Sequence, residues 1–398
     1  MSHKKIKIDQ IAYLNLETYS KLDLPEVVEY LDTGSITRNT IIGFQRYTTN
    51  TEELPSRAQR KAKKNTILYS TVRPNLEHHG ILENPPKNII VSTGFTTIDI
   101  HDDTIDPKYL YYAITQKHYT EYLHTIATNN VSSYPSINPD DLGNLVLSVP
   151  EIIEDQKRIA AVLSALDAKI ELNNRINTEL EAMAKTLYDY WFVQFDFPDK
   201  NGKPFKSSGG KMVWNEQLKR EIPEGWANAT IEMVIDKQPS AEKLQTQNYS
   251  KIGSIPIIDQ SQDYICGYTD SESTIIIPDQ PHVIFGDHTR VVKLVNFKYA
   301  RGADGTQVLV PKMSNMPGYL LYQIVSTIDL SNYGYARHFK FLKESKIVIP
   351  SQSVAQQYSK FVSSLYLQRT ANIVQNRELS SLRDWLLPML MNGQVKVV

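Results

Sequence analysis

Side chains that could bind nucleic acid are the most prominent chemical feature of this sequence. Arginine can form paired hydrogen bonds with guanine, Asn and Gln can do so with adenine, and Lys, Ser and Thr hold phosphates. The densest basic segment, Arg57-Ala-Gln-Arg-Lys-Ala-Lys-Lys64, has five basic residues in eight. It predicts phosphate contacts, although a solvated loop or helix face has the same composition. Its candidate residues are Arg57, Arg60, Lys61, Lys63 and Lys64.

Two polar segments follow short apolar strands at matching places in the two halves of the chain. Ile67-Leu-Tyr-Ser70 precedes the first, and Val283-Ile-Phe-Gly286 precedes the second. A loop that follows a strand is held rigidly enough to present side chains to a ligand, whereas ordinary turn chemistry is the alternative. The candidates here are Thr71, Arg73 and Asn75, and His288, Thr289 and Arg290. Further candidates are Ser132, Ser133, Tyr134, Arg337 and His338, ahead of two proline-ended strands, and Gln45, Lys293 and Arg301.

The motif that comes nearest to catalysis is incomplete. Asn84-Pro-Pro-Lys87 resembles the start of the Asn-Pro-Pro-aromatic loop of adenine methyltransferases, but Lys87 cannot stack on a flipped base as the aromatic residue does. No glycine-rich strand-to-helix turn that would hold S-adenosylmethionine precedes it. A proline turn between strands is the better interpretation.

Metal and nucleophile chemistry has equally little support. Asp140 followed by Asp155 and Lys157 imitates a nuclease pattern, but the last two are expected on the first turn of a helix, where an acid favours the helix dipole. His78, His79 and His101 lack partners at metal-ligand spacing. Cys266 is the only cysteine and is expected to be a small core residue. We therefore expect no catalytic and no metal-binding residue.

Length and composition predict a two-domain protein. The chain has 398 residues and an apolar content of 41%, enough for two cores of ordinary size. It has no apolar run of membrane-spanning length and no secretory signal, so we expect a cytoplasmic location. The net charge of −1 counts against a protein that grips nucleic acid by bulk charge, although local basic residues remain compatible with base reading.

An internal repeat organises the chain. Each half has a mixed segment rich in short β-like runs, then a short strand that ends in proline, then a long helical pattern. The strands are Leu145-Val-Leu-Ser-Val-Pro150 and Ser345-Lys-Ile-Val-Ile-Pro350. Within the mixed segments, Tyr109-Leu-Tyr-Tyr-Ala-Ile114 resembles Tyr319-Leu-Leu-Tyr-Gln-Ile324.

The helical segments carry the sharpest signal. Apolar residues recur at alternating steps of four and three, which is the seam of a coiled coil. The same frame recurs 199 positions later, as from Asn173 to Asn372 and from Asn177 to Asn376, although arginine occupies positions 369 and 383 of the second seam. A polar residue in a seam costs stability and fixes register, whereas asparagine is also common on solvated faces. The predicted seam residues are Leu163, Leu166, Ile170, Asn173, Asn177, Leu180 and Leu187, with Val362, Leu365, Asn372, Asn376, Leu379 and Leu386.

These patterns predict an α+β fold, with two similar mixed α/β recognition domains separated by two long antiparallel helices in a pseudo-twofold repeat. Helices of about 35 residues make a rod of roughly 50 Å, about one and a half turns of B-DNA. We expect a first domain over residues 1–150, a helix over 151–195, a linker over 196–221, a second domain over 222–350, and a helix with a tail over 351–398. Ser207-Ser-Gly-Gly-Lys211 lacks the spacing of a phosphate-binding loop and is expected to be flexible linker.

Three segments carry a family resemblance that spans essentially the whole chain. The run from Ile152 to Asn174, with its core Gln156-Lys-Arg-Ile-Ala160, resembles the first conserved helix of the specificity subunits of Type I restriction–modification enzymes. Thr186-Leu-Tyr-Asp-Tyr-Trp-Phe192 is similar to the end of that helix, and Ile222-Pro-Glu-Gly-Trp226 to the family's entry into a recognition domain. The second helix departs from the pattern, with Gln356-Gln-Tyr-Ser-Lys360 at its start.

The resemblance implies a DNA-recognition subunit without catalysis of its own. Each domain would read half of a bipartite site in double-stranded DNA, and the helix pair would set the spacer between the halves. The implied partners are two adenine-N6 methyltransferase subunits, which use S-adenosylmethionine, and optionally motor and nuclease subunits, which use ATP and Mg²⁺. The alternatives are a fused methyltransferase or nuclease, or a coiled-coil scaffold without affinity for DNA.

Overall fold

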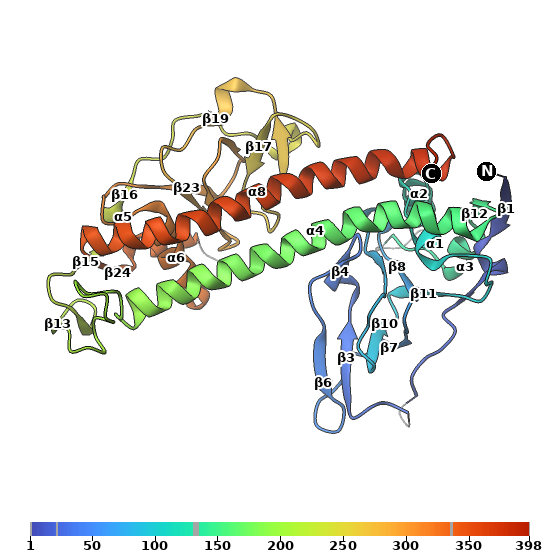
Figure 1. Cartoon of the computed structure of the whole chain (residues 1–398), viewed down its shortest axis with the longest axis horizontal. Coiled ribbons are helices and arrows are strands. Elements are labelled where there is room, and N and C mark those ends of the chain that lie inside the picture. Colours follow the sequence, from blue (N-terminus) through green and yellow to red (C-terminus); the bar gives the residue numbers. More distant parts are fainter. Residues whose placement is uncertain (1, 21–22, 130–134, 335–336, 398) are drawn as a thin grey trace. The chain divides into compact units, whose positions relative to one another are not determined.

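The computed structural model describes residues 2–20, 23–129, 135–334 and 337–397. The chain forms two compact units, one of residues 1–173 and 375–398 and the other of residues 174–374 (Figure 1). Each unit combines one mixed domain with part of each long helix. Within the described residues, no helix has a stretch apolar enough to cross a lipid bilayer.

Unit 1 contains two four-stranded sheets. One sheet has the order β2-β11-β8-β9 and the other has the order β6-β3-β10-β7. In the second sheet, β3 and β10 run parallel and the outer strands are antiparallel to their neighbours. The strands are β2 (Ala12–Leu14), β3 (Val27–Leu31), β6 (Gln45–Thr48), β7 (Ala58–Lys61), β8 (Ile67–Ser70), β9 (His79–Ile81), β10 (Ile89–Ser92) and β11 (Phe95–Ile100).

Unit 2 repeats this topology strand for strand. Its sheets have the orders β16-β23-β20-β21 and β18-β17-β22-β19, and again only the middle pair, β17 and β22, is parallel. The strands are β16 (Ile235–Asp236), β17 (Ile255–Ile258), β18 (Gly267–Thr269), β19 (Ile275–Ile276), β20 (His282–Gly286), β21 (Val292–Val295), β22 (Tyr299–Arg301) and β23 (Thr306–Pro311). The internal repeat predicted from the sequence is confirmed.

The smaller elements also correspond. An antiparallel pair, β1 (His3–Lys7) with β12 (Val146–Pro150), matches β15 (Ala227–Thr230) with β24 (Lys346–Ile349). Tyrosine-rich helices cover equivalent strands, α1 (Pro107–Ile114) in unit 1 and α6 (Gly318–Thr327) in unit 2. The remaining elements are β4 (Ile36–Thr37), β5 (Thr40–Ile41), α2 (Lys117–Asn129), α3 (Pro139–Gly143), β13 (Met212–Asn215), β14 (Arg220–Pro223), α5 (Ile231–Val234) and α7 (His338–Glu344).

The two long helices are α4 (Ile153–Tyr188), which continues as a π-helical turn over Asp189–Val193, and α8 (Gln352–Met391). Within unit 1, Asp167 of α4 contacts Arg383 of α8, and Asn173 contacts Asn376. Within unit 2, Asn177 contacts Asn372 and Glu181 contacts Arg369. Partner numbers fall along α8 as they rise along α4, so the helix segments in each unit pack antiparallel, as predicted (Figure 1).

A buried glutamine anchors the start of α4. Gln156 is fully buried, and its amide donates to the backbone oxygens of Thr104 and Pro150 and accepts from the backbone N–H of Asp106. All of its hydrogen-bonding groups but one lone pair are thus satisfied without water. This glutamine belongs to the segment that carries the family resemblance, and its role is to fix the helix to the domain.

The segment before the second domain is folded, unlike the flexible linker expected at Ser207–Lys211. The ring of Phe197 stacks on those of Phe205 and Trp226, at 4.7 and 5.0 Å between centroids, and Asp196 accepts hydrogen bonds from the backbone and hydroxyl of Ser207. The β13–β14 hairpin follows directly. Buried aromatic side chains supply the packing that the small residues of this segment lack.

Candidate nucleic-acid interface

In each unit, loops from distant parts of the chain meet at one end of the sheets. In unit 1 they follow β3, β8 and β10, and the backbone N–H of Thr71 donates to Gly94 O at 2.9 Å. In unit 2 the equivalent loops follow β17, β20 and β22, and the N–H of Asp287 donates to Gly305 O at 2.8 Å. We call residues 32–35, 71–75, 92–94 and 135–137 the first loop cluster, and residues 259–263, 287–290, 302–305 and 337–339 the second loop cluster.

The segment before the proline-ended strand joins each cluster through an equivalent backbone bond. In unit 1, the N–H of Ile137 donates to Thr71 O at 2.9 Å. In unit 2, the N–H of His338 donates to Asp287 O at 3.0 Å. The segments that the sequence placed at matched positions therefore lie together in both units. Ser132, Ser133 and Tyr134, which were candidates in the first of them, lie outside the described residues.

Each loop cluster exposes an arginine whose backbone is left-handed. Arg73 has φ of 47° and Arg290 has φ of 60°, and both side chains are exposed. A residue other than glycine or asparagine rarely adopts this conformation, and it persists only where the surrounding structure imposes it. The two arginines occupy equivalent loops after β8 and β20, so the repeat keeps both the residue type and its unusual backbone.

The predicted candidates differ in accessibility. Exposed candidates are Gln45, Arg57, Lys63, Lys64, Arg73, Asn75, His288, Thr289, Arg290 and Arg337, whereas Arg60, Lys61 and Thr71 are half-buried. Gln45 and Arg57 join the first loop cluster: Gln45 donates to Asp32 Oδ2 at 3.0 Å, and Arg57 O accepts from the N–H of Thr93 at 2.8 Å.

Three candidates in unit 2 are buried, so the structure corrects their assignment as direct DNA contacts. Lys293 donates from Nζ to the backbone oxygens of Asp259 and Asp263, at 2.8 and 2.5 Å. Arg301 donates to Gln238, and the ring of His338 contacts Asp287 O at 3.0 Å. Burial lowers the pKa of Lys293 and of Arg301. Lys293 therefore has a structural role, because its ammonium group binds backbone oxygens of the loop after β17.

The basic segment 57–64 is not a single patch. The segment runs along strand β7. Because a strand rises about 3.3 Å per residue, the two ends of the segment lie roughly 20 Å apart. Arg57 is at the first loop cluster, whereas Lys63 and Lys64 line a pocket of about 340 Å³ near the start of β8 and the end of β11. Lys61 is paired with Asp23 at 2.8 Å and Glu17 at 3.7 Å, and the hydrogen bond with Asp23 raises the pKa of Lys61.

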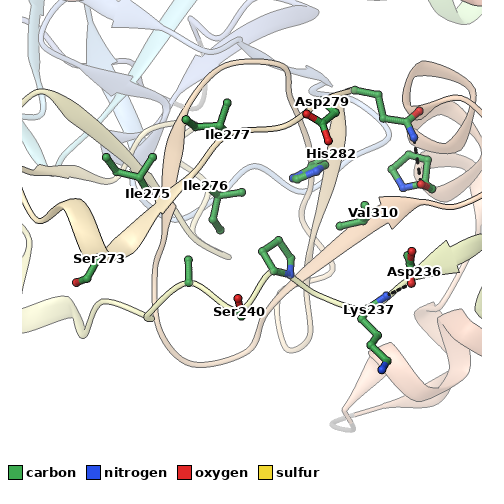
Figure 2. Close-up of a pocket in the computed structure, with 14 residues that line it drawn as sticks. Asp236, Lys237, Ser240, Ser273, Ile275, Ile276, Ile277, Asp279, His282 and Val310 are labelled. Atoms are coloured by element: carbon green, nitrogen blue, oxygen red, sulfur yellow. Dashed lines mark hydrogen bonds between the residues drawn. The ribbon is translucent and has the colours of Figure 1, made fainter.

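A larger pocket in unit 2, about 760 Å³, lies at the corresponding end of that domain (Figure 2). Its lining includes Asp236, His282 at the start of β20 and Pro311 at the end of β23. The second loop cluster is at the opposite ends of the same two strands, so the pocket is not part of the candidate interface. The described residues contain no group of three His, Cys, Asp or Glu side chains placed to hold a metal ion.

The sequence prediction missed the residue that organises the second loop cluster. Gln260 donates from Nε2 to Asp304 O at 2.7 Å and accepts at Oε1 from the backbone N–H of His288 at 3.1 Å. Its backbone oxygen accepts from the hydroxyl of Thr289 at 2.6 Å. A repeated sequence signal could have pointed to it. Leu31-Asp32 and Ile258-Asp259 lie at the ends of the equivalent strands β3 and β17, and Gln260 directly follows the second of these pairs.

The motifs that imitate catalytic sites lie in ordinary structural settings. Asn84-Pro-Pro-Lys87 lies in the loop between β9 and β10. Asp155 is on the first turn of α4 and pairs with Arg158 at 2.5 Å. Cys266 is half-buried and donates to Ile257 O at 3.1 Å, and burial raises the pKa of its thiol to about 12. A protonated thiol of this kind is a poor nucleophile.

The predicted seam positions of the helices are all buried or half-buried, and the asparagines contact one another. In unit 1, Asn173 donates from Nδ2 to Asn376 Oδ1 at 2.8 Å and to Gln375 Oε1 at 2.7 Å. In unit 2, Asn372 donates to Asn177 Oδ1 at 2.9 Å. Asn173 is equivalent to Asn372 and Asn376 to Asn177, so the repeat makes the same amide bond twice. Such bonds penalise any other register, because a shifted helix would bury the amides without partners.

Comparisons with known proteins agree with this architecture. Residues 4–182 match the family described as the Type I restriction modification DNA specificity domain. The chain is 26% identical to the Type I restriction enzyme HindI specificity subunit of Haemophilus influenzae, over 93% of this chain and 95% of that protein. It is 27% identical to the MjaIX specificity subunit of Methanocaldococcus jannaschii, over 84% of this chain and 78% of that protein.

A solved structure shares the fold. The S subunit of a Type-I restriction-modification system from M. genitalium is 17% identical, has a TM-score of 0.53, and aligns over 98% of this chain and 96% of that one. The duplicated domains, the antiparallel helices and the sequence matches over nearly the full length agree with one another: the chain is similar to the specificity subunits of Type I restriction–modification systems.

Proposed function

We propose that this chain is the non-catalytic DNA-recognition subunit of a Type I restriction–modification complex, and that each loop cluster reads one half of a bipartite site. The observation that carries the proposal is the duplicated loop cluster. Two domains of one topology present equivalent loops, each with an exposed arginine in left-handed backbone. Arginine is the side chain best suited to paired hydrogen bonds with guanine in the major groove.

The candidate contacts fall into two groups under this proposal. Arg73, Asn75, Thr289 and Arg290 are assigned to base edges, and Gln45, Arg57, Thr71, His288 and Arg337 to bases or phosphates nearby. Lys63 and Lys64 lie at the other end of the domain and are left out of this set. Lys293, Arg301 and His338 support the loops from within.

The long helices would act as a ruler between the two half-sites. Helix α4 has 36 residues and therefore a length of about 54 Å. The amide bonds between seam asparagines hold the helices in one register. A fixed register keeps the two helices from sliding along one another, and this would keep the number of unread base pairs constant.

The proposed partners are double-stranded DNA, two adenine methyltransferase subunits that use S-adenosylmethionine, and motor and nuclease subunits that use ATP and Mg²⁺. Lys157, Lys169 and Arg175 are exposed on α4, and Leu382 and Trp385 are exposed on α8, so both helices offer surface for docking. Such a complex would act in the cytoplasm, where the cell's DNA lies.

Methylome sequencing tests the proposal directly. A strain that expresses this chain with its partner methyltransferase should carry N6-methyladenine in one split motif, and a strain lacking the chain should lose that motif alone. An unchanged methylome would overturn the proposal. In the complex, Arg73→Ala and Arg290→Ala should each relax discrimination in a different half of the motif, by about 10- to 100-fold at one base pair. Lys63→Ala is the matched control and should leave both halves unchanged.

A further inference from the structure

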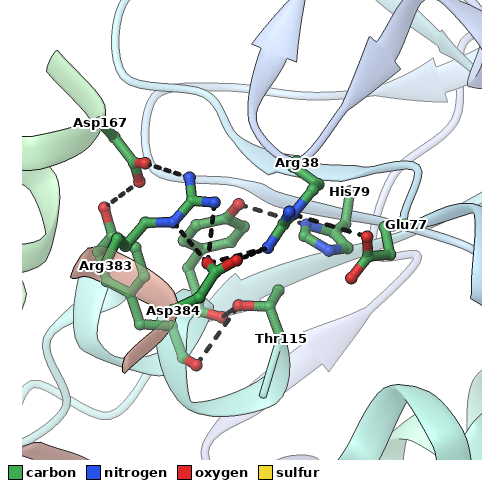
Figure 3. A network of polar contacts seen from close by, with 9 residues as sticks. Arg38, Glu77, His79, Thr115, Asp167, Arg383 and Asp384 are labelled. Atoms are coloured by element: carbon green, nitrogen blue, oxygen red, sulfur yellow. Dashed lines mark hydrogen bonds and ion pairs between the residues drawn. The ribbon is translucent and has the colours of Figure 1, made fainter. Parts of the chain in front are cut away.

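A network of charged side chains in unit 1 runs from the helix pair to Glu77, two residues beyond the 71–75 loop of the first loop cluster (Figure 3). It includes Arg383, one of the two arginines that interrupt the predicted seam of the second helix. The network involves α4, α8, the β4–β5 turn and the loop after β8, all within the same unit. Its contacts extend beyond what pairing of two helices requires.

On the helix side, the network is largely buried. Arg383 Nη1 contacts Asp167 Oδ1 at 2.6 Å, and their side chains are only 12% and 17% exposed. The hydroxyl of Tyr112, from α1, donates to Asp167 Oδ2 at 2.6 Å. Arg383 also donates from Nε and Nη2 to Asp384 Oδ1, at 3.0 Å each. Asp384 is thereby held in one orientation at the edge of the helix pair.

On the domain side, Arg38 joins Asp384 to the loop after β8, which contains Arg73 and which we call the first reading loop. Arg38 Nη2 lies 3.0 and 2.9 Å from the two carboxylate oxygens of Asp384, and its Nε lies 3.6 Å from Glu77 Oε2. The backbone N–H of Arg38 also donates to Glu77 O at 2.9 Å. Glu77 ends the 3₁₀ turn Pro74–Leu76, which begins at Arg73. The chain of contacts therefore ends at Glu77, at the far end of the turn that begins at the proposed base-reading arginine.

The backbone along this path is unusually constrained. Arg38, Asn39, Arg73 and Glu77 all have left-handed backbone, with φ of 46°, 67°, 47° and 55°. Asn39 is also fixed by its side chain, which accepts from the N–H of Ile81 at 2.8 Å. Such conformations are imposed by surrounding contacts. The turn and the loop thus have little freedom of their own, and their placement depends on the contacts they make.

We propose that Arg38 and Asp384 are positioning residues, which hold the first reading loop at a fixed orientation to the helix pair. Neither needs to contact DNA. The inference rests on the proposed function, because orientation to the helices matters only if a methyltransferase docks there and acts at the base that the loop selects. Arg383 and Asp167 serve the same role one step further from the loop.

The test uses the full chain in complex with its methyltransferase, on the bipartite site that the methylome defines. Methylation rates are measured on duplexes with single base changes in either half. Arg38→Gly removes the side chain and suits the left-handed backbone, so the turn is retained. Asp384→Asn keeps the shape and removes the charge. Lys108→Gln is the control, since it breaks the Lys108–Glu83 ion pair of the same unit, at 2.8 Å and similar exposure.

Arg38→Gly and Asp384→Asn should lower discrimination in the first half by about 3- to 10-fold and leave the second half unchanged. Arg38→Lys should restore most of the loss, and the double variant should be no worse than Asp384→Asn alone. Equal losses in both halves, no loss, or additive losses would overturn the inference. A wild-type complex that methylates no split motif would instead overturn the proposed function.

Discussion

The two units share a strand order, but different kinds of side-chain contact join the domain to the helix pair in each of them. In unit 1, Arg383 pairs with Asp167 and the path to the loop consists of ion pairs. In unit 2, Arg369 pairs with Glu181 at 2.5 Å, and its guanidinium lies 4.5 Å from the centre of the Tyr264 ring. Arg383 is thus joined by further ion pairs, whereas Arg369 adds a cation–π contact with a tyrosine of its own unit.

The starts of the two helices differ in the same way. Pro150 O accepts from Gln156 of α4 itself, whereas Pro350 O accepts from Asn315, which precedes α6. The carbonyl is satisfied in both units, but by residues from different parts of the repeat. The duplication has therefore kept the frame of strands, helices and seam, while the side chains that join domain to helix have been replaced.

The largest expected difference between the units concerns the two arginine pairs. Arg383→Ala leaves Asp167 without a cationic partner at 17% exposure, with the hydroxyl of Tyr112 still bonded to it, so the free energy of unfolding should fall by roughly 3 kcal/mol. Arg369→Ala should cost only about 1 kcal/mol, because Glu181 is 40% exposed and water can solvate it. Urea unfolding of the full chain measures the totals, and amide hydrogen exchange assigns each loss to its unit. Equal losses would contradict this account of the difference.

A smaller difference should appear in acid. His79 is buried in unit 1, and burial, followed by the charges of Arg38 and Arg383, lowers its pKa to about 3. Val292 occupies the equivalent strand position in unit 2, opposite Phe285 as His79 is opposite Tyr69. Below the ordinary histidine pKa of about 6.5 the unfolded chain binds a proton that the folded unit does not, so stability falls as the pH falls.

Between pH 7 and pH 5 this histidine should cost unit 1 about 2 kcal/mol. His79→Val, which copies unit 2, should remove that part of the pH dependence. The measurement is urea unfolding at pH 5, 6 and 7, with hydrogen exchange to follow unit 1. A variant as sensitive to acid as the wild type would assign the effect to another group.

The smallest effect should be the same in both units. Asn173→Ala and Asn372→Ala each remove one donor of an equivalent amide bond, and each should destabilise its unit by about 1 kcal/mol. Matching losses of hydrogen-exchange protection around the two sites would sharpen the comparison. Losses that differ by more than about 1 kcal/mol would show that the seam bonds are not equivalent.

The helical frame could be predicted from the sequence because its signal is local and periodic. The spacing of four and three, and the recurrence of Asn173 and Asn177 at 372 and 376, fixed the seam and the antiparallel pairing. Arg369 and Arg383 seemed to weaken the second seam. Their acidic partners, Glu181 and Asp167, directly follow the seam leucines Leu180 and Leu166, so the pairs lie at the edge of the seam, where charge is tolerated.

The loop clusters were only partly predictable, because their residues come from segments far apart in the chain. Arg73 and Arg290 became candidates because similar short predicted strands, Ile67–Ser70 and Val283–Gly286, precede them in the two halves of the chain. Residue type alone did not separate exposed Arg290 from buried Lys293, since a basic side chain can bind phosphate or satisfy buried backbone oxygens. Gln260 was missed because its partners, Asp304 and His288, are 44 and 28 residues away.

The left-handed backbone at Arg73 and Arg290 limits how the chemistry of the two loop clusters can change over time. At positions 73 and 290 a β-branched residue such as Val, Ile or Thr would be strongly strained, and glycine, asparagine or aspartate would be accepted most readily. Neighbouring positions such as Asn75 and Thr289 have ordinary backbone and are open to a wider choice of side chains. Under the proposed function, new target preferences should therefore arise more often through these neighbours than through the two arginines themselves.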